Sequence, residues 1–141
     1  MESKGLRLEK TFNLEKFIKV LETTYTEVCN MFGEDSTEPE DFLETDNCVF
    51  LFDSERQYIF CGAVIMSDSY GFFGIQVGAN WLESAGKLES QGFKQADDLE
   101  RFTKLMPDFG ISVYLYPDDC PDVKLSTVKD YSISTRYGHA L

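Results

Sequence analysis

The hydrophobic positions near the start of the chain recur at intervals of three and four residues. Over residues 13–32 they form one stripe, made of Leu14, Phe17, Ile18, Leu21, Tyr25, Val28 and Phe32. This spacing is typical of an amphipathic helix. Asn13 is a suitable N-cap and Gly33 a suitable stop. The pattern therefore predicts one helix over residues 13–32, which three threonines in its second half weaken because their χ1 angles are restricted.

Three apolar runs follow this helix. They cover residues 48–52, 58–67 and 72–78 and are separated by short polar stretches. Apolar runs joined by short turns favour an antiparallel meander. Gly62, inside the second run, predicts a bulge or a point where another backbone comes close.

The second half of the chain returns to a helical pattern and then to strands. Residues 80–91 predict a helix capped by Asn80 and interrupted at Gly86, and residues 95–106 predict another helix. Residues 111–116 predict a strand, and residues 123–136 one or two more.

The order of these elements indicates the fold class. Strands cluster with strands and helices with helices, which is typical of α+β proteins. We expect a single domain over residues 1–141. In it, a largely antiparallel sheet of about five or six strands packs with an N-terminal helix and one or two central helices.

Composition agrees with a folded, aromatic core. The chain has 141 residues, of which 43% are hydrophobic and 14% aromatic. A disordered chain lacks the apolar surface that offsets the entropy of ordering.

The first ten residues are charged and do not resemble a secretory signal. The apolar runs are far shorter than the ~20 residues that a membrane-spanning helix needs. We therefore expect no membrane association and a cytoplasmic location.

The four cysteines, Cys29, Cys48, Cys61 and Cys120, form no CxxC pair. Free cysteine behaves as a small buried hydrophobe, so we expect reduced thiols. Cys48 and Cys61 flank a predicted hairpin, and they are the pair that could face each other in a disulfide.

Candidate catalytic and metal motifs fail on inspection. His139, the single histidine, lies close to the last residue of the sequence, where a general acid or base would be poorly held. The stretch SAGKLES lacks the glycine and Ser/Thr spacing of a phosphate loop. The stretch YPDDCPD lacks the alternating acids of a calcium loop. Glu83 and Glu89 lie on predicted helices and are expected to be solvated. We expect no catalytic residue, cofactor or metal, and hence no enzyme.

The charge is one-sided along the chain. The formal net charge is −12. Residues 20–86 contain thirteen acids and one base, whereas the rest contains twelve acids and twelve bases. The densest part is GEDSTEPEDFLETDN, residues 33–47, with seven acids. A one-sided distribution of charge creates an electrostatic field that steers basic partners toward the protein and repels nucleic acid and anionic lipid.

Two interpretations of this acidic segment stay open. It could be a solvated loop, or it could be a contact surface in which an aromatic side chain sits beside charges, as interfaces favour. Pro39 predicts the first position of a short helix, PEDFLET, anchored by Phe42 and Leu43. The candidate partner-binding residues are Glu34, Asp35, Glu38, Glu40, Asp41, Phe42, Glu44 and Asp46.

We therefore expect a small acidic, non-catalytic binding protein. Immunity proteins that neutralise bacterial toxins have this size, charge and lack of motifs, and so do phage inhibitors that imitate nucleic acid. Confinement of the acids to one part of the chain favours the immunity type, with a basic toxin or nuclease as partner. An enzyme or small-molecule binder with a pocket that motifs do not reveal stays an alternative. The apolar strand at residues 111–116 could form an exposed edge and a weak homodimer.

Overall fold

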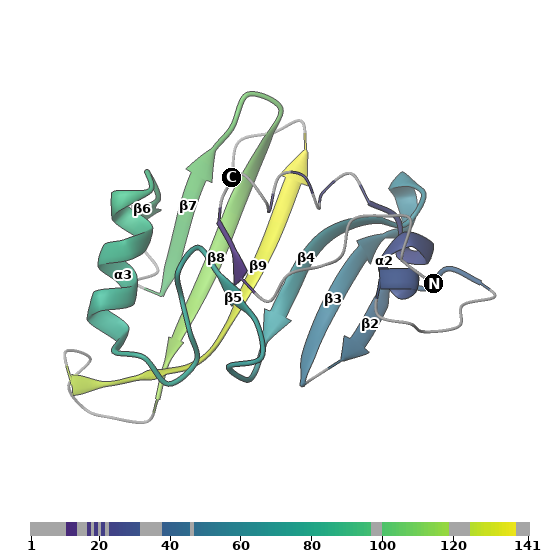
Figure 1. Ribbon diagram of the computed structural model, residues 1–141. Coiled ribbons are helices and arrows are strands. Elements are labelled where there is room, and N and C mark those ends of the chain that lie inside the picture. The colour runs from purple at the N-terminus through teal and green to yellow at the C-terminus, as the bar shows by residue number, and fades with distance from the viewer. Residues whose placement is uncertain are drawn as a thin grey trace.

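The computed structural model describes residues 11–13, 17, 19, 21, 23–31, 38–45, 47–96, 100–118 and 125–137 (Figure 1). Its named helices are α2 (Tyr25–Met31), the short 3-10 helix η1 (Ser54–Arg56) and α3 (Trp81–Ser90). None of the described helices is long and apolar enough to cross a membrane.

The main feature is one antiparallel sheet with seven strands in the order β2-β3-β4-β9-β8-β7-β6. Their bounds are β2 (Phe42–Thr45), β3 (Cys48–Asp53), β4 (Ile59–Ile65), β6 (Lys94–Gln95), β7 (Arg101–Leu105), β8 (Phe109–Pro117) and β9 (Val128–Tyr137). A separate pair of two-residue strands, β1 (Thr11–Phe12) and β5 (Gly71–Phe72), is parallel. The predicted α+β class and antiparallel sheet are confirmed. The expected five or six strands were too few.

The last strand joins two meanders into this sheet. One meander contains β2, β3 and β4, and the other contains β6, β7 and β8. Strand β9 inserts between them and pairs with β4 through Gly62–Ser134 and with β8 through Val113–Ile133. Residues 111–116 therefore lie inside the sheet, between β9 and β7. They do not form the exposed edge on which the homodimer hypothesis was based.

The first predicted helix is interrupted. Helical hydrogen bonds join Phe17 to Asn13 and Leu21 to Phe17, at 2.9 and 3.1 Å. The backbone then pairs with β4 at Thr23 and Thr24, and α2 begins directly afterwards. Pairing with β4 uses the extended conformation that β-branched residues prefer. One continuous helix over 13–32 was therefore wrong.

Helix α3 matches its prediction in extent and in cap. The side chain of Asn80 accepts a hydrogen bond from the N–H of Glu83 at 2.8 Å. Trp81 anchors the helix to the sheet, since its indole N–H donates to the carbonyl of Leu115 at 2.8 Å. Gly86 does not interrupt the helix, and the space around it is open, so close packing does not explain it.

Two other predictions were wrong. Of the expected strand at 72–78, only Phe72 belongs to a strand, β5, because Phe73 and Gly74 have positive φ and the N–H of Ile75 closes a turn onto Phe72. The helix expected over residues 95–106 is instead the hairpin partner of β8. Strand β7 pairs along its whole length with β8, from Arg101 opposite Tyr114 onward, so tertiary pairing overrides the weak helical pattern.

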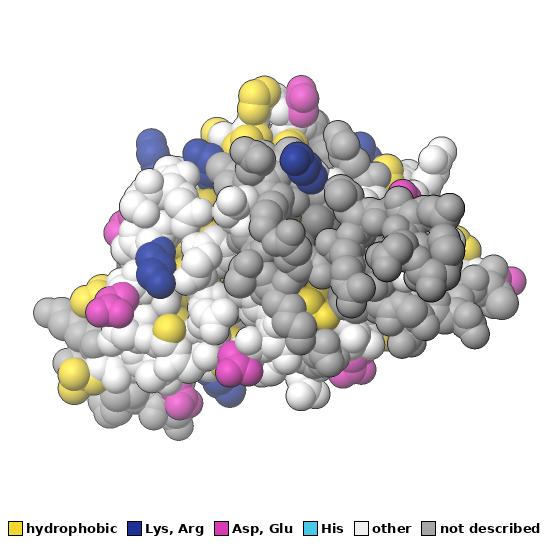
Figure 2. Space-filling model, in the orientation of Figure 1, with side chains coloured by type: hydrophobic (Ala, Val, Ile, Leu, Met, Phe, Trp, Pro, Cys, Tyr) yellow, Lys and Arg dark blue, Asp and Glu magenta, His cyan; other side chains and the backbone are white. Residues whose placement is uncertain are grey.

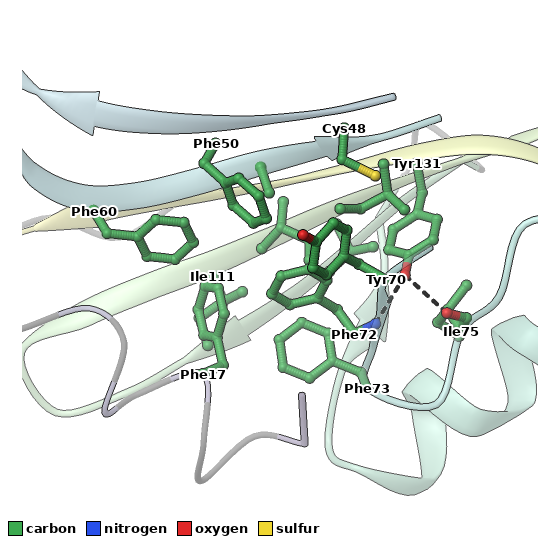
Figure 3. Packing of buried hydrophobic residues seen from close by; sticks show 14 of the residues in the cluster. Phe17, Cys48, Phe50, Phe60, Tyr70, Phe72, Phe73, Ile75, Ile111 and Tyr131 are labelled. Carbon is green, nitrogen blue, oxygen red and sulfur yellow. Dashed lines mark hydrogen bonds between the residues drawn. The ribbon is translucent and has the colours of Figure 1, made fainter. Parts of the chain in front are cut away.

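The core lies on one face of the sheet. In Figure 1, strands β1 and β5 lie in front of the middle of the sheet, α2 lies at its β2–β3 end and α3 stands beside β7 at the other end. Phe17 packs edge-on against Phe60, Phe72 and Phe73, with ring centroids 5.2–6.0 Å apart. Figure 3 shows this aromatic layer between the sheet and the loop after β5. Edge-to-face contacts between aromatic rings stabilise the fold beyond the contribution of the apolar area that the rings bury.

The opposite face, which we call the outer face, carries the alternate side chains of each strand. Val49, Leu51, Val64 and Tyr114 are half-buried there. No helix covers this face in the part of the chain that the structure describes. By strand alternation it carries three exposed apolar side chains at separate places, Phe42 on β2, Leu105 on β7 and Tyr116 on β8.

Candidate interaction surface

Strand β2 holds the centre of the predicted acidic segment at one end of the sheet. Residues 42–45 form a strand, so the short helix PEDFLET was wrong. Its side chains alternate, with Phe42 51% exposed and Leu43 buried opposite Phe50. This alternation fits a half-buried strand better than a helical turn. Asn47, in the turn to β3, has φ 60, a conformation that asparagine tolerates well.

The acids of this segment are held on the surface around β2. Glu38, Glu40, Asp41 and Glu44 are all exposed, and so is Phe42 between them. We call these five residues the β2 edge surface. The other three candidates, Glu34, Asp35 and Asp46, lie outside the described residues. The structure therefore brings five of the eight predicted residues to one short strand and the four residues before it.

Helix α2 fixes the start of this surface. The hydroxyl of Tyr25 donates to the Glu40 carboxylate at 3.3 Å. The Tyr25 ring packs edge-on against Phe52 of β3, with centroids 5.1 Å apart. A hydrogen bond with Cys29 and burial raise the pKa of Tyr25 to about 12, and the Glu40 charge adds to the shift. Tyr25 therefore stays a neutral donor and orients Glu40 at physiological pH.

Charge is polarised across the sheet. Among described residues, the 38–68 region around β2, β3 and β4 contains seven acids and one base, Arg56. In the full sequence, residues 94–137, which include β6 to β9, contain eight acids and six bases, against eight acids and one base over residues 38–68. On the face shown in Figure 2, Lys and Arg side chains gather mainly on the side of α3, β7 and β8. The asymmetry along the sequence thus becomes an acidic end and a balanced end of one sheet.

Tyr114 and Tyr116 form a second cluster, on the outer face. Their rings stack with centroids 6.1 Å apart and planes at 19°. Burial raises the pKa of Tyr116, a hydrogen bond with Ser132 opposes the shift, and nearby carboxylates add to it. The two rings thus place aromatic surface on the outer face at β8.

The cysteines offer no disulfide at the predicted pair. Cys48 is buried on the core face opposite Ile65, whereas Cys61 is the extra residue of a bulge on the outer face. The two thiols therefore lie on opposite faces and at opposite ends of the β3–β4 hairpin. Burial raises the pKa of Cys61 to about 11, so its thiol is protonated at neutral pH. Cys29 is buried, and Cys120 lies outside the described residues.

The remaining candidate motifs have structural roles or are not described. Lys87 of SAGKLES donates to the carbonyl of Gly74 at 3.2 Å and so ties α3 to the loop after β5. Glu83 and Glu89 are exposed, as predicted. His139 and two of the three aspartates of YPDDCPD lie outside the described residues. The residues that the structure describes contain no group of three or more His, Cys, Asp or Glu side chains that could hold a metal.

The sequence-based prediction missed strand β2 itself. The signal was present, because FLET alternates and a two-residue turn, Asp46–Asn47, precedes the apolar run at 48–52. Such a turn between two strand patterns is typical of a hairpin. Comparisons of the chain with protein-family models, with curated proteins and with solved structures found no match.

Proposed function

We propose that this protein binds and neutralises a basic protein through the β2 edge surface, as an immunity protein does. The observation that carries the proposal is the grouping of four exposed acids around one half-exposed aromatic, Phe42, at the acidic end of the sheet. Aromatic anchors supply binding energy, while charges around them speed association and exclude wrong partners.

The distribution of charge favours a protein partner over imitation of nucleic acid. A mimic of the phosphate backbone needs acids spread along an extended surface, at the density of the charges it imitates. Here the acids are concentrated around β2, because residues 38–68 have eight acids and one base whereas residues 94–137, which include β6 to β9, have eight acids and six bases. A local acidic surface with an apolar centre fits a basic protein surface better.

The test begins with capture and ends with affinity. The immobilised protein is exposed at low salt to a lysate of the cells that encode it, and basic proteins eluted by high salt are identified and purified. Affinity is then measured by calorimetry for the wild type and for the triple variant Glu38→Lys, Asp41→Lys, Glu44→Lys. We expect at least a hundredfold loss, because three attractive contacts become repulsive.

The control reverses three exposed acids elsewhere, through Glu83→Lys, Glu89→Lys and Asp108→Lys. It has the same net charge as the test variant, so a general electrostatic effect would weaken both equally. Equal losses in the two variants, or an unchanged affinity in the first, would reject the β2 edge surface as the binding site.

A further inference from the structure

Strand β2 is an edge whose outward backbone groups can be identified. It is the first strand in the sheet order, and β3 is its partner among the described residues. The N–H of Phe52 donates to the carbonyl of Asp41 at 2.9 Å, which places Asp41 in a hydrogen-bonded pair. In an antiparallel ladder such pairs alternate with pairs whose backbone groups point away. The N–H and C=O groups of Phe42 and Glu44 therefore point away from β3, toward the side of β2 on which no other described strand pairs.

The same two residues present their side chains on the outer face. Phe42 lies opposite Leu51 and Glu44 opposite Val49. A strand added at this edge would place one side chain beside Phe42 and another, two residues along, beside Glu44. Aromatic or β-branched residues pair well with phenylalanine, and Lys or Arg with glutamate, across neighbouring strands. The edge therefore selects an incoming strand with an apolar and a basic residue on one face.

Charge decides which occupant fits. A second copy of this chain, paired through β2, would bring Glu38, Glu40, Asp41 and Glu44 of both copies together, and like charges facing each other are destabilising. Acids on an edge strand oppose self-association in this way. They do not oppose a basic strand, which the acidic end of the sheet attracts.

We propose that the partner docks by adding an extended basic strand to β2, with backbone hydrogen bonds to Phe42 and Glu44. This inference rests on the proposed function and specifies the form of the partner. Strand addition gives affinity through main-chain hydrogen bonds and specificity through alternate side chains.

The probe is a capped synthetic peptide, Lys-Val-Tyr-Val-Lys-Val-Lys, titrated into the full chain. Two analogues carry N-methyl groups, one on the amides of the odd residues and one on those of the even residues. N-methylation removes donors from one side of the peptide and leaves its charge unchanged. We expect one analogue to bind like the parent and the other at least about tenfold more weakly, which corresponds to the loss of one or two hydrogen bonds. We also expect slower hydrogen exchange of the Phe42 and Glu44 amides when the peptide is bound.

Matched variants test the protein side. Glu44→Gln removes the charge and keeps the N–H, whereas Glu44→Pro also removes the N–H, on an edge where proline leaves the β2–β3 ladder intact. Peptide affinity should fall further in Glu44→Pro than in Glu44→Gln. If both analogues bind like the parent and both variants bind equally, strand addition is wrong, while binding by charge stands. If the parent peptide does not bind, strand addition is also wrong, and charge reversal against the captured protein decides the proposed function separately.

Discussion

The hydroxyl of Tyr131 accepts a hydrogen bond from the backbone N–H of Phe72 at 2.8 Å. The same hydroxyl donates to the carbonyl of Ile75, also at 2.8 Å (Figure 3). Tyr131 is fully buried on β9, and the two partners belong to the turn that carries the aromatic layer. One side chain thus makes hydrogen bonds to a buried backbone donor and a buried backbone acceptor of this turn.

Removing this hydroxyl should destabilise the fold without changing its shape. Tyr131→Phe leaves the Phe72 N–H and the Ile75 C=O without their shared partner, at a cost of about 1–3 kcal/mol in the free energy of unfolding. Urea denaturation measures this change. Tyr114→Phe, at a half-buried site on the outer face, is the control and should change stability by less than about 0.5 kcal/mol. Equal effects in the two variants would contradict a structural role for the Tyr131 hydroxyl.

Stability should fall at alkaline pH. A hydrogen bond with Cys29 and burial raise the pKa of Tyr25 to about 12, and burial raises that of Tyr131. Unfolded tyrosine ionises near pH 10, so above that pH the unfolded state has lost protons that the folded state keeps. The contribution of these two tyrosines to the free energy of unfolding is therefore fully present below about pH 10 and is lost as the pH rises toward 12. Urea denaturation from about pH 8 to about pH 11 should show this fall, and Tyr131→Phe should make it shallower. An identical slope in the variant would contradict the assignment.

Helix α2 starts with a reciprocal cap. The N–H of Thr24 donates to the Glu27 carboxylate at 2.9 Å, and the N–H of Glu27 donates to the Thr24 hydroxyl at 3.3 Å. Thr24→Ala should lower the free energy of unfolding by about 0.5–2 kcal/mol, as loss of an N-cap does. Thr26→Ala, at an exposed position in the same helix, is the control. Thermal melts of the two variants measure the effect. An equal fall in Tm for Thr26→Ala would show that the loss comes from removing any threonine of this helix and not from removing the cap.

This cap shows how far the sequence could predict the fold. The spacing Thr24-x-x-Glu27 is a helix-start signal that stands in the sequence, yet the long apolar stripe over 13–32 hid it. The stripe was correct about burial, since Phe17, Leu21, Tyr25 and Val28 are all buried. It could not reveal the break, because the break depends on pairing between Thr23–Thr24 and a strand about 35 residues further along.

The charge of the β2 edge surface could be predicted from the sequence, but its geometry could not. Counting acids located the β2 edge surface, and exposure of Phe42 beside them agrees with the contact hypothesis. The exposed edge could not be derived, because it depends on which strands become neighbours. Strand β9 joins β4 through contacts about 70 residues apart, and this long-range pairing leaves β2 at one end. Local patterns do not report such pairings.

Two glycines should respond oppositely to alanine. A Cβ at Gly62 would clash with the carbonyl of Ile133, where β4 crosses close to β9, so the predicted close approach is confirmed. Gly62→Ala should cost about 1–3 kcal/mol, as overpacking does. Gly86 is exposed in α3 with nothing near its Cβ position, so Gly86→Ala should stabilise by about 0.5–1 kcal/mol. Differential scanning calorimetry should show opposite shifts in Tm, and shifts of the same sign would contradict the local geometry at one of the two sites.

Phe42 should matter for binding and not for folding. It is 51% exposed on β2 and Leu82 on α3 is 47% exposed, so the two apolar residues are matched in the exposed fraction of the residue. Phe42→Ala and Leu82→Ala should each change the free energy of unfolding by less than about 0.5 kcal/mol, since neither side chain fills the core.

Only Phe42 lies among the acids at the strand edge, where a partner would enclose an aromatic anchor. Phe42→Ala should therefore weaken binding to the captured basic protein by at least about tenfold, and Leu82→Ala should leave it unchanged. Calorimetric titration of both variants separates a binding role from a general loss of surface hydrophobicity, because that loss is common to both. An equal effect on affinity in the two variants would place the contact elsewhere on the molecule.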